Sequence, residues 1–325
     1  MAKKILIASV SDDLHGLLVS DELRKQGVDV YYLNIDKMHD YVINWDNTFK
    51  KKATIVFPNN RVLDISRIPL IWWRRVSSLK NIQENSLKEN EPSKYDKFTN
   101  KSWPVSLRSI LLAAHTGKWI SSPSATESAS NKIHQLEIAR EVGFRTPRTL
   151  VSNNPQEVKE FALNFPNKVI IKPLVSIEEL LFTQKVDVEK IPDEDIAACP
   201  CIYQEYIEGT KHLRINVFGK YCYAAQIETS DVDWRPNLNV PITSYELPRS
   251  MEQKLQDVLK RLNLEMGIFD FKISESGEYV WFEVNPQGQF LFLEPLTNQN
   301  LLQNFVNYLI EEMNNNIRVI TKKAV

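Results

Sequence analysis

The sequence predicts an α/β protein with a Rossmann-like opening domain and two later α+β lobes. Apolar runs at residues 4–10 and 28–35 flank a helical leucine pattern that stops near Gly27, which indicates a β-α-β unit. Residues 267–290 form two arms in which apolar side chains alternate with others, the pattern of a β-hairpin. A strand near residue 120 gives way to a further series of helices and strands. We therefore expect three segments, residues 1–120, 121–200 and 201–325.

The turn after the first strand argues against a dinucleotide site. Residues 9–13 read Ser-Val-Ser-Asp-Asp and contain no glycine. A dinucleotide-binding turn needs glycines so that the backbone can approach the pyrophosphate closely. The opening domain is therefore expected to be Rossmann-like in shape only.

Composition excludes several classes of function. The 325 residues carry a net charge of −1, so no general basic field attracts nucleic acid or anionic membrane. The three cysteines lack zinc-type spacing and are expected to be reduced thiols, as in a cytoplasmic protein. The first apolar run stops at Asp12, too early for a signal peptide or a membrane span. We expect a cytoplasmic protein of enzyme size.

The hairpin at residues 267–290 carries the most informative polar residues. One face of each arm is apolar, and the other face carries Asp270 on the first arm and Glu283 with Asn285 on the second. A two-residue loop at Ser276-Gly277 would pair residues whose numbers sum to about 553. That register places Asp270 directly opposite Glu283.

The same register places Phe271 opposite Phe282 on the apolar face. On the polar face, two neighbouring carboxylates repel each other. A hard dication held by oxygen ligands would offset this repulsion, and Mg²⁺ beside nucleotide phosphates is the commonest case. The alternative is an ordinary solvated strand face. Three converging oxygen ligands favour the metal.

Basic residues follow two other predicted strands. Lys172 ends the apolar run 169–172 just before a loop, where its ammonium group can meet a phosphate. Residues 174–186 contain no glycine, unlike loops that hold phosphate through backbone amides. Arg74 and Arg75 also end a buried strand. They fit either a fork onto a carboxylate or phosphate, or a surface ion pair.

Three further segments have weaker patterns. The strand at 202–207 ends at an edge that can offer a backbone carbonyl and amide to adenine, although it also fits a plain strand. Lys132 lies early in a helix predicted over residues 126–142, where an exposed lysine is ordinary. Residues 233–235, Asp-Trp-Arg, lie in a polar loop, where a tryptophan suggests contact with a partner.

The order of these elements resembles the ATP-grasp superfamily across nearly the whole chain. In that superfamily an acidic residue and a Glu-any-Asn triplet hold Mg²⁺, as Asp270 and residues 283–285 would here. Residues 72–75, 131–136 and 233–235 are similar to the graspetide synthetases, which include the microviridin-type ligases. Those enzymes close side-chain lactone or lactam rings in a ribosomal precursor peptide.

The resemblance implies an ATP-grasp fold in which the two α+β lobes clamp ATP. It also implies that ATP phosphorylates an Asp or Glu side chain of the precursor peptide, and that a Thr or Ser hydroxyl or a Lys amine then attacks the acyl phosphate. Such catalysis depends mostly on positioning and electrostatics. A homodimer and two Mg²⁺ ions are implied in the same way.

The resemblance further implies a set of site residues with four roles. These are Lys132 and Lys172 for phosphate, Gln204, Glu205, Tyr206 and Ile207 for adenine, Asp270, Glu283 and Asn285 for Mg²⁺, and Arg214, Asp233 and Arg235 for catalysis. Within the last group, Arg214 would stabilise the transferred phosphoryl group. Asp233 and Arg235 would meet the acidic core of the peptide.

Two alternatives remain open. A carboxylate–amine ligase of small or C-terminal substrates would share the ATP site, and a non-catalytic ATP-binding scaffold would share the fold. The tryptophan–arginine segments favour the peptide ligase. The complete set of metal ligands with Arg214 argues against the scaffold. One departure is His212, which stands where relatives often have an acidic residue.

Overall fold

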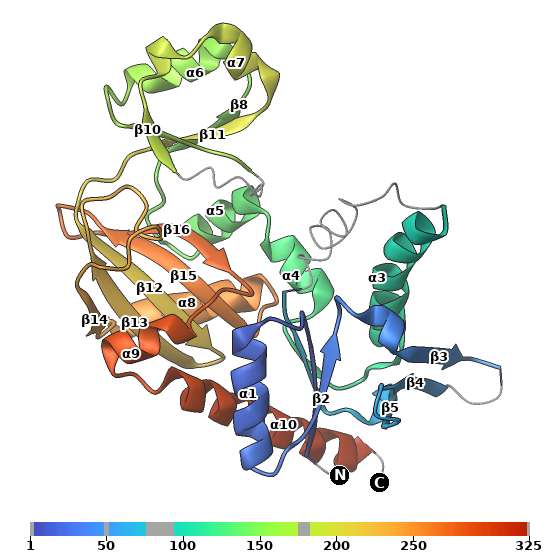
Figure 1. Cartoon of the computed structure of the whole chain (residues 1–325). Helices are drawn as coiled ribbons and strands as arrows, with labels where there is room; N and C mark the ends of the chain where they lie inside the picture. Colours follow the sequence, from blue (N-terminus) through green and yellow to red (C-terminus); the bar gives the residue numbers. More distant parts are fainter. Residues whose placement is uncertain (1–2, 49–51, 76–93, 175–182, 324–325) are drawn as a thin grey trace. The chain divides into compact units, whose positions relative to one another are not determined.

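The chain divides into two compact units (Figure 1). The computed structural model describes residues 3–48, 52–75, 94–174 and 183–323. Unit 1 comprises Met1–Thr126, Asn263–Met266 and Asn300–Val325, and unit 2 comprises Glu127–Leu262 and Gly267–Gln299. The division into three segments at residues 120 and 200 stays a prediction. The glycine-free segment 174–186 lies mostly outside the described residues.

Unit 1 is built on a parallel sheet in the order β2-β1-β6-β7. Its strands are β1 (Lys4–Ser9), β2 (Asp29–Asn34), β6 (Leu70–Trp73) and β7 (Lys118–Ile120). Helix α1 (Leu14–Lys25) connects β1 to β2, so the predicted β-α-β unit is confirmed. The central strands β1 and β6 are buried almost throughout because a parallel sheet is covered on both faces.

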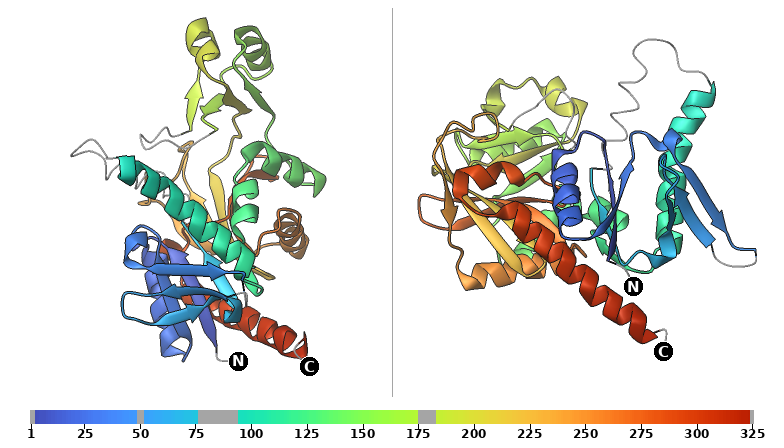
Figure 2. Two further views of the ribbon diagram at one scale, coloured as in Figure 1. Left: turned by 90° about the vertical axis from the view of Figure 1, so that its right-hand side faces the viewer. Right: turned by 60° about the horizontal axis from the view of Figure 1, so that its bottom comes forward.

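Helices and a small sheet complete unit 1. Helix α10 (Leu301–Lys323) lies beside α1, as Figures 1 and 2 show. It also contacts β6 and β7. Strands β3 (Val42–Asp46), β4 (Lys52–Val56) and β5 (Val62–Asp64) form an antiparallel sheet, which helix α3 (Lys94–Ala114) contacts at β4. Two 3-10 turns, η1 (Met38–Asp40) and η2 (Ile65–Arg67), connect these elements.

Unit 2 contains two antiparallel layers, of which the first has the order β10-β9-β11-β8. Its strands are β8 (Thr149–Ser152), β9 (Val169–Lys172), β10 (Gln184–Val186) and β11 (Cys201–Glu205). Helices α6 (Pro155–Leu163) and α7 (Asp193–Ala198) and the 3-10 turn η4 (Val188–Lys190) pack together over it. Their shared core includes Val158, Val188 and Tyr203.

The second layer of unit 2 is a five-stranded sheet in the order β14-β13-β12-β15-β16. Its strands are β12 (Lys211–Phe218), β13 (Tyr221–Glu228), β14 (Ile242–Tyr245), β15 (Met266–Ile273) and β16 (Tyr279–Asn285). Helix α8 (Arg249–Arg261) buries one apolar stripe. Short helices η5 (Leu291–Leu293) and α9 (Glu294–Thr297) follow the hairpin. No helix of the described residues is both long and apolar enough to cross a bilayer.

The helix expected over residues 126–142 is two helices, α4 (Pro123–Ala129) and α5 (Lys132–Glu141). The Asn131 side chain accepts hydrogen bonds from the amides of Ile133 and His134 at 3.0 and 3.1 Å. This is an N-cap, which starts a new helix because it satisfies the first free amides. Lys132 is therefore the first residue of α5.

The β15–β16 hairpin has a different turn from the one expected. Ser274 donates its amide to the carbonyl of Glu278 at 3.0 Å, and Gly277 donates to Ser274 at 2.9 Å. Gly277 has φ +83°, the left-handed conformation that ends a three-residue hairpin loop. Near the turn, paired residue numbers therefore differ from the expected register by one, as in the pair Ile273 and Tyr279.

A β-bulge restores the expected register further along. Phe271 pairs with Trp281, whereas the next pair is Asp270 with Glu283, so Phe282 is the extra residue. The expected pairing of Phe271 with Phe282 is thus wrong, and the pairing of Asp270 with Glu283 is confirmed. Trp281 fills the core instead and contacts the ring of Phe271 edge-on.

Candidate active site

The acidic face of β15 and β16 lies next to Arg214 on β12. Arg214 Nη1 donates to both carboxylate oxygens of Asp270, at 2.9 and 2.7 Å, and its Nη2 donates to the carbonyl of Gln289 at 3.0 Å. Strand β12 neighbours β15 in the sheet, so this contact follows from the strand order. Glu283 is paired with Asp270 across the ladder, and Asn285 ends β16 in an exposed position.

The electrostatics of this face suit a bound cation. Burial raises the pKa of Asp270 above its ordinary value, Arg214 opposes the rise, and Glu283 adds to it. A dication beside the two carboxylates would stabilise their ionised form and lower the pKa of Asp270. No cluster of three or more His, Cys, Asp or Glu is arranged for a metal within the described residues. The donor set is two carboxylates and one amide, the hard oxygen ligands that Mg²⁺ accepts alongside phosphates.

The two predicted phosphate-binding lysines lie close together. Lys132 donates to the carbonyl of Pro173, next to Lys172, at 3.3 Å. Burial lowers the pKa of Lys172 to about 8, Glu283 opposes that shift, and Lys132 adds to it. Since Glu283 and Lys132 both act on the charge of Lys172, the structure places the two lysines near the acidic face of the hairpin.

Asp233 and Arg235 form a pair with each other in the loop between β13 and β14. Asp233 Oδ1 accepts from the Arg235 amide at 3.1 Å and from its Nε at 2.8 Å. The Arg235 side chain is 52% exposed, whereas that of Asp233 is buried. Burial raises the pKa of Asp233, but Arg235 reverses the shift and holds that pKa below its ordinary value. Asp233 therefore fixes the charged guanidinium group of Arg235, which remains accessible to solvent.

Trp234 between them is buried and does not await a partner. Its ring stacks on Phe292 at 6.0 Å with an angle of 22° between the planes. The guanidinium of Arg214 lies 5.6 Å from the centroid of the Trp234 ring. Packing within unit 2 thus explains the tryptophan that the sequence suggested as a partner contact.

The predicted adenine segment lies at the end of β11. The Gln204 side chain is buried and donates to Thr149 Oγ1 at 2.8 Å. The Glu205 carboxylate accepts from the Arg148 amide at 3.1 Å and lies 3.3 Å from Arg145 Nη2. Both side chains are therefore committed to neighbouring strands and loops.

Backbone amides in this segment are also partly committed. Glu205 donates its amide to the carbonyl of Arg148 at 2.9 Å, and Tyr206 donates to the carbonyl of Lys168 at 2.7 Å. A contact of adenine with Glu205 would use the carbonyl of that residue, and a contact with Ile207 would use its amide. Ile207 itself is buried.

Several solved structures share this fold. A RiPP-associated ATP-grasp ligase from Chryseobacterium gregarium, in complex with ADP and a leader and core peptide, has 26% identity and a TM-score of 0.83, over 96% of this chain and 97% of that one. The macrocyclase MdnB from Microcystis aeruginosa has 25% identity and a TM-score of 0.73, over 94% and 99%. The ligase PsnB, complexed with minimal precursor, Mg and ADP, has 20% identity and a TM-score of 0.75, over 95% and 97%.

No protein-family model matches the sequence, and no curated protein matches it either. The structural likeness nevertheless extends over both units and includes structures at 25% identity or above. The chain is an ATP-grasp ligase. The predicted fold class is thereby confirmed.

Sequence reasoning missed a buried lysine in the ATP-grasp ligase. Lys272 is 1% exposed and lies on β15, two residues after Asp270. Its Nζ is 4.9 Å from the centroid of the Tyr206 ring, and Lys185 Nζ is 3.6 Å from the same centroid. Burial lowers the pKa of Lys272 to about 8. A lysine between the apolar residues Phe271 and Ile273 was the available signal.

His212 was predicted to stand at a position that is often acidic in ATP-grasp enzymes. It is buried on β12, and burial lowers its pKa to about 4, so the imidazole is neutral at pH 7. Its Nε2 has no hydrogen-bond partner among the described residues of the ligase. A neutral imidazole lacks the charge that a metal or ribose contact through a carboxylate would provide.

Arg74 makes a buried ion pair in unit 1. Its Nε donates to Asp13 Oδ2 at 2.7 Å, and the same oxygen accepts from Ser9 Oγ at 2.8 Å. The surface ion pair considered for Arg74 is therefore wrong in its location, because both side chains are enclosed. Arg75 follows with φ +50° and is half-buried.

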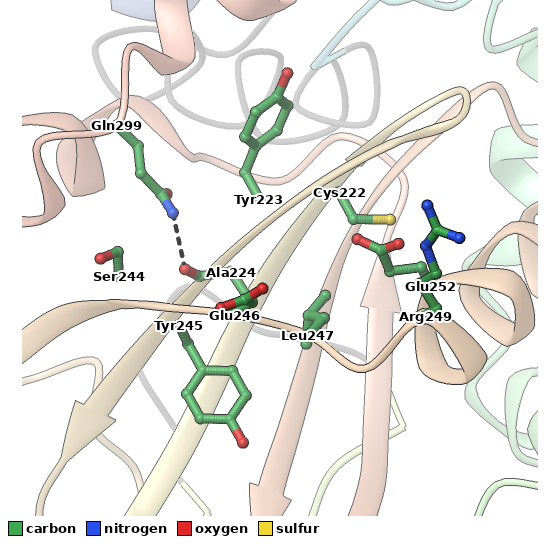
Figure 3. Close-up of a pocket in the computed structure, with 10 residues that line it drawn as sticks. All are labelled: Cys222, Tyr223, Ala224, Ser244, Tyr245, Glu246, Leu247, Arg249, Glu252 and Gln299. Atoms are coloured by element: carbon green, nitrogen blue, oxygen red, sulfur yellow. Dashed lines mark hydrogen bonds between the residues drawn. The ribbon is translucent and has the colours of Figure 1, made fainter.

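A pocket of about 440 Å³ lies elsewhere in unit 2, between β13, β14 and the start of α8 (Figure 3). Tyr223, Tyr245 and the carboxylates of Glu246 and Glu252 line it. Burial raises the pKa of Cys222 in its wall to about 12, so this cysteine is an unreactive thiol. None of the predicted site residues lines this pocket.

Proposed function

We propose that this ATP-grasp ligase cross-links side chains of a ribosomally made precursor peptide. The observation that carries the proposal is the set of charges in which Lys132 and Lys172 lie near the acidic face of β15 and β16, within a fold shared with a ligase solved with ADP and a leader and core peptide. The cluster supplies both signs of charge that phosphoryl transfer needs.

The proposed reaction has two steps. The γ-phosphoryl group of ATP moves to an Asp or Glu carboxylate of the peptide, which gives an acyl phosphate and ADP. A Thr or Ser hydroxyl then attacks the acyl carbon, loses its proton and expels phosphate, which leaves an ester. A Lys amine would give an amide by the same route. Each ring removes the elements of one water from the peptide.

The residues of the acidic face would hold the metal–nucleotide complex. Asp270, Glu283 and Asn285 would bind Mg²⁺, which neutralises phosphate charge when bound. Lys132 and Lys172 would contact the phosphates, since they lie together at the ends of α5 and β9. These residues position the transferred group without forming a covalent bond to it.

Two arginines would serve the transfer itself. Arg214 is fixed by Asp270 and the Gln289 carbonyl, so its guanidinium would stabilise the transferred phosphoryl group with little reorganisation. Arg235 is held by Asp233 but half exposed, which suits an acidic side chain of the core peptide. We also propose two Mg²⁺ ions, a cytoplasmic location and a homodimer, the last measurable by light scattering.

Intact mass spectrometry tests the function. A precursor peptide with Thr or Ser and Asp or Glu in its core is incubated with the ligase, ATP and Mg²⁺. We expect losses of one, two or more waters, and base hydrolysis then separates ester from amide. An unchanged peptide mass with ADP release on a small carboxylate and amine would instead establish the small-substrate ligase. Nucleotide binding with no turnover of either substrate would establish the scaffold.

A further inference from the structure

Gln135 joins the helix that carries Lys132 to the strand that carries Glu283. It lies on α5, and only 3% of it is exposed. Its Oε1 accepts the amide of Val284 at 2.8 Å, and its Nε2 donates to the carbonyl of Val284 at 2.9 Å. The same Nε2 donates to the carbonyl of Ala129 at 2.6 Å. One side-chain amide thus satisfies both backbone groups of a strand residue.

Strand β16 needs such a partner at this point because it is the edge strand of its sheet. Backbone groups of successive strand residues face opposite edges. Glu283 pairs with Asp270 on the β15 side, so Val284 directs its amide and carbonyl away from the sheet. The Gln135 amide occupies the place that a further strand would fill, and it closes the edge where unpaired groups would otherwise bond to water.

Val284 is the residue between two proposed metal ligands. Its side chain is buried, while Glu283 and Asn285 point to the opposite face. When both backbone groups of Val284 are held, the two peptide planes that carry these ligands are held as well. Asn285 is the last residue of β16, and strand ends open most readily when unpaired.

We propose that Gln135 is a positioning residue that fixes the metal ligands of β16 relative to α5. This inference rests on the proposed Mg²⁺–nucleotide site, which it deepens. Gln135 lies three residues after Lys132, so both side chains project from the same side of one helix. The hydrogen bonds of Gln135 therefore set the distance between Lys132 and the proposed metal ligands of β16.

The test measures metal binding without turnover. Mn²⁺ serves as the probe, and its free signal in electron paramagnetic resonance reports binding in the presence of ADP. Gln135→Leu keeps the side-chain volume and removes all three hydrogen bonds. We expect Mn²⁺ affinity to fall by roughly tenfold, the effect typical of losing a group that orients metal ligands. Binding of ADP without metal should stay unchanged, because the Asn131 cap still fixes Lys132.

Gln256→Leu is the matched control. Gln256 lies on α8 and donates a side-chain hydrogen bond to the carbonyl of Lys220 at 3.0 Å, at a turn that holds no predicted ligand. This variant should bind Mn²⁺ as the unaltered protein does. If Gln135→Leu does not fold, as judged by circular dichroism, Gln135→Met is measured instead, since its unbranched chain fits a gap more readily.

Two outcomes would overturn the positioning role of Gln135, and a third would overturn the metal site. Wild-type Mn²⁺ affinity in a folded Gln135 variant would overturn the positioning role. An equal loss of ADP affinity with and without metal would also overturn it, because a general loosening of unit 2 would then be the cause. Failure of the unaltered protein to bind Mn²⁺ with ADP would overturn the proposed metal site itself.

Discussion

Two arginine–aspartate pairs, one in each unit, share their chemistry and differ in their surroundings. Arg74 and Asp13 in unit 1 have side chains that are 0% and 1% exposed. Arg214 and Asp270 in unit 2 are 8% and 15% exposed, and a second carboxylate, Glu283, stands beside them. The first pair is closed on all sides, and the second keeps an open face.

The pKa values of the two aspartates move in opposite directions. Burial raises the pKa of Asp13, but Arg74 and Ser9 outweigh burial and hold it below the ordinary value. In Asp270, burial with the help of Glu283 outweighs Arg214, and the pKa is raised. Arg74 and Ser9 thus offset the burial of Asp13, whereas Arg214 does not offset the burial of Asp270 beside Glu283. This difference fits a structural ion pair in unit 1 and the proposed metal site in unit 2.

Loss of a carboxylate on the open face should have the largest effect. Glu283→Gln keeps the side-chain shape and removes a ligand charge, so turnover should fall roughly a thousandfold or more, which is several kcal/mol of transition-state stabilisation. The rate of ADP release in the presence of peptide measures this. Full activity of a folded Glu283→Gln protein would remove the metal site from the mechanism.

Loss of the buried pair of Arg74 and Asp13 should lower the stability of the protein and leave its catalytic activity unchanged. Arg74→Met leaves Asp13 buried without its counter-charge, and the free energy of unfolding should fall by about 3–5 kcal/mol. Urea unfolding followed by tryptophan fluorescence measures it. Arg75→Met, at a half-buried neighbour, is the control and should change stability by less than about 0.5 kcal/mol. Equal effects of the two substitutions would contradict the structural role of Arg74.

The half-exposed arginine of unit 2 should matter for the peptide alone. Arg235→Ala removes a charged fork worth about 1.5–3 kcal/mol to a bound carboxylate, so kcat/KM for the peptide should fall roughly tenfold to a hundredfold. The Kd for ADP should hardly change. Arg235→Lys retains the charge without the two-pronged guanidinium group, so its kcat/KM should lie between those of the unaltered protein and Arg235→Ala. Unchanged ring formation in Arg235→Ala would show that the core peptide binds elsewhere.

The smallest effect concerns pH. Burial lowers the pKa of Lys172 to about 8, so its charge is present below that pH and is lost above it. Metal-free ADP should therefore bind more weakly as pH rises, by about tenfold between pH 7 and pH 9. Lys172→Arg, which stays charged, should flatten the profile. A profile unchanged by that substitution would assign the titration to Lys272, whose pKa also lies near 8.

Much of the fold follows from local sequence patterns. The apolar runs of β1 and β2 with the glycine after α1 predicted the first β-α-β unit, and alternation predicted both arms of the hairpin. The break before Lys132 was missed because Thr126 to Val142 keeps a helical apolar period. The Asn131 side chain, whose hydrogen bonds are visible in the structure, caps the second helix at this break.

The site was less accessible than the fold. The ladder position of Asp270 and Glu283 could be predicted, since alternation fixes the faces of a strand. The partners of Arg74 and Gln135 could not, because they lie 61 and 149 residues away along the chain. Lys272 was missed because alternation predicts on which face of the strand a side chain lies. It does not predict whether that face is buried.

The β-bulge at Phe282 has a consequence for how such sites are found in other sequences. A three-residue turn and one extra residue in β16 cancel, so the carboxylates meet as they would across a shorter loop without a bulge. Both arrangements leave the same number of residues between Asp270 and Glu283, so the spacing of the pair does not distinguish them. The pairing of the two carboxylates can therefore be predicted even where the turn is predicted wrongly. The core beside the pair cannot, because the bulge places Trp281 instead of Phe282 opposite Phe271.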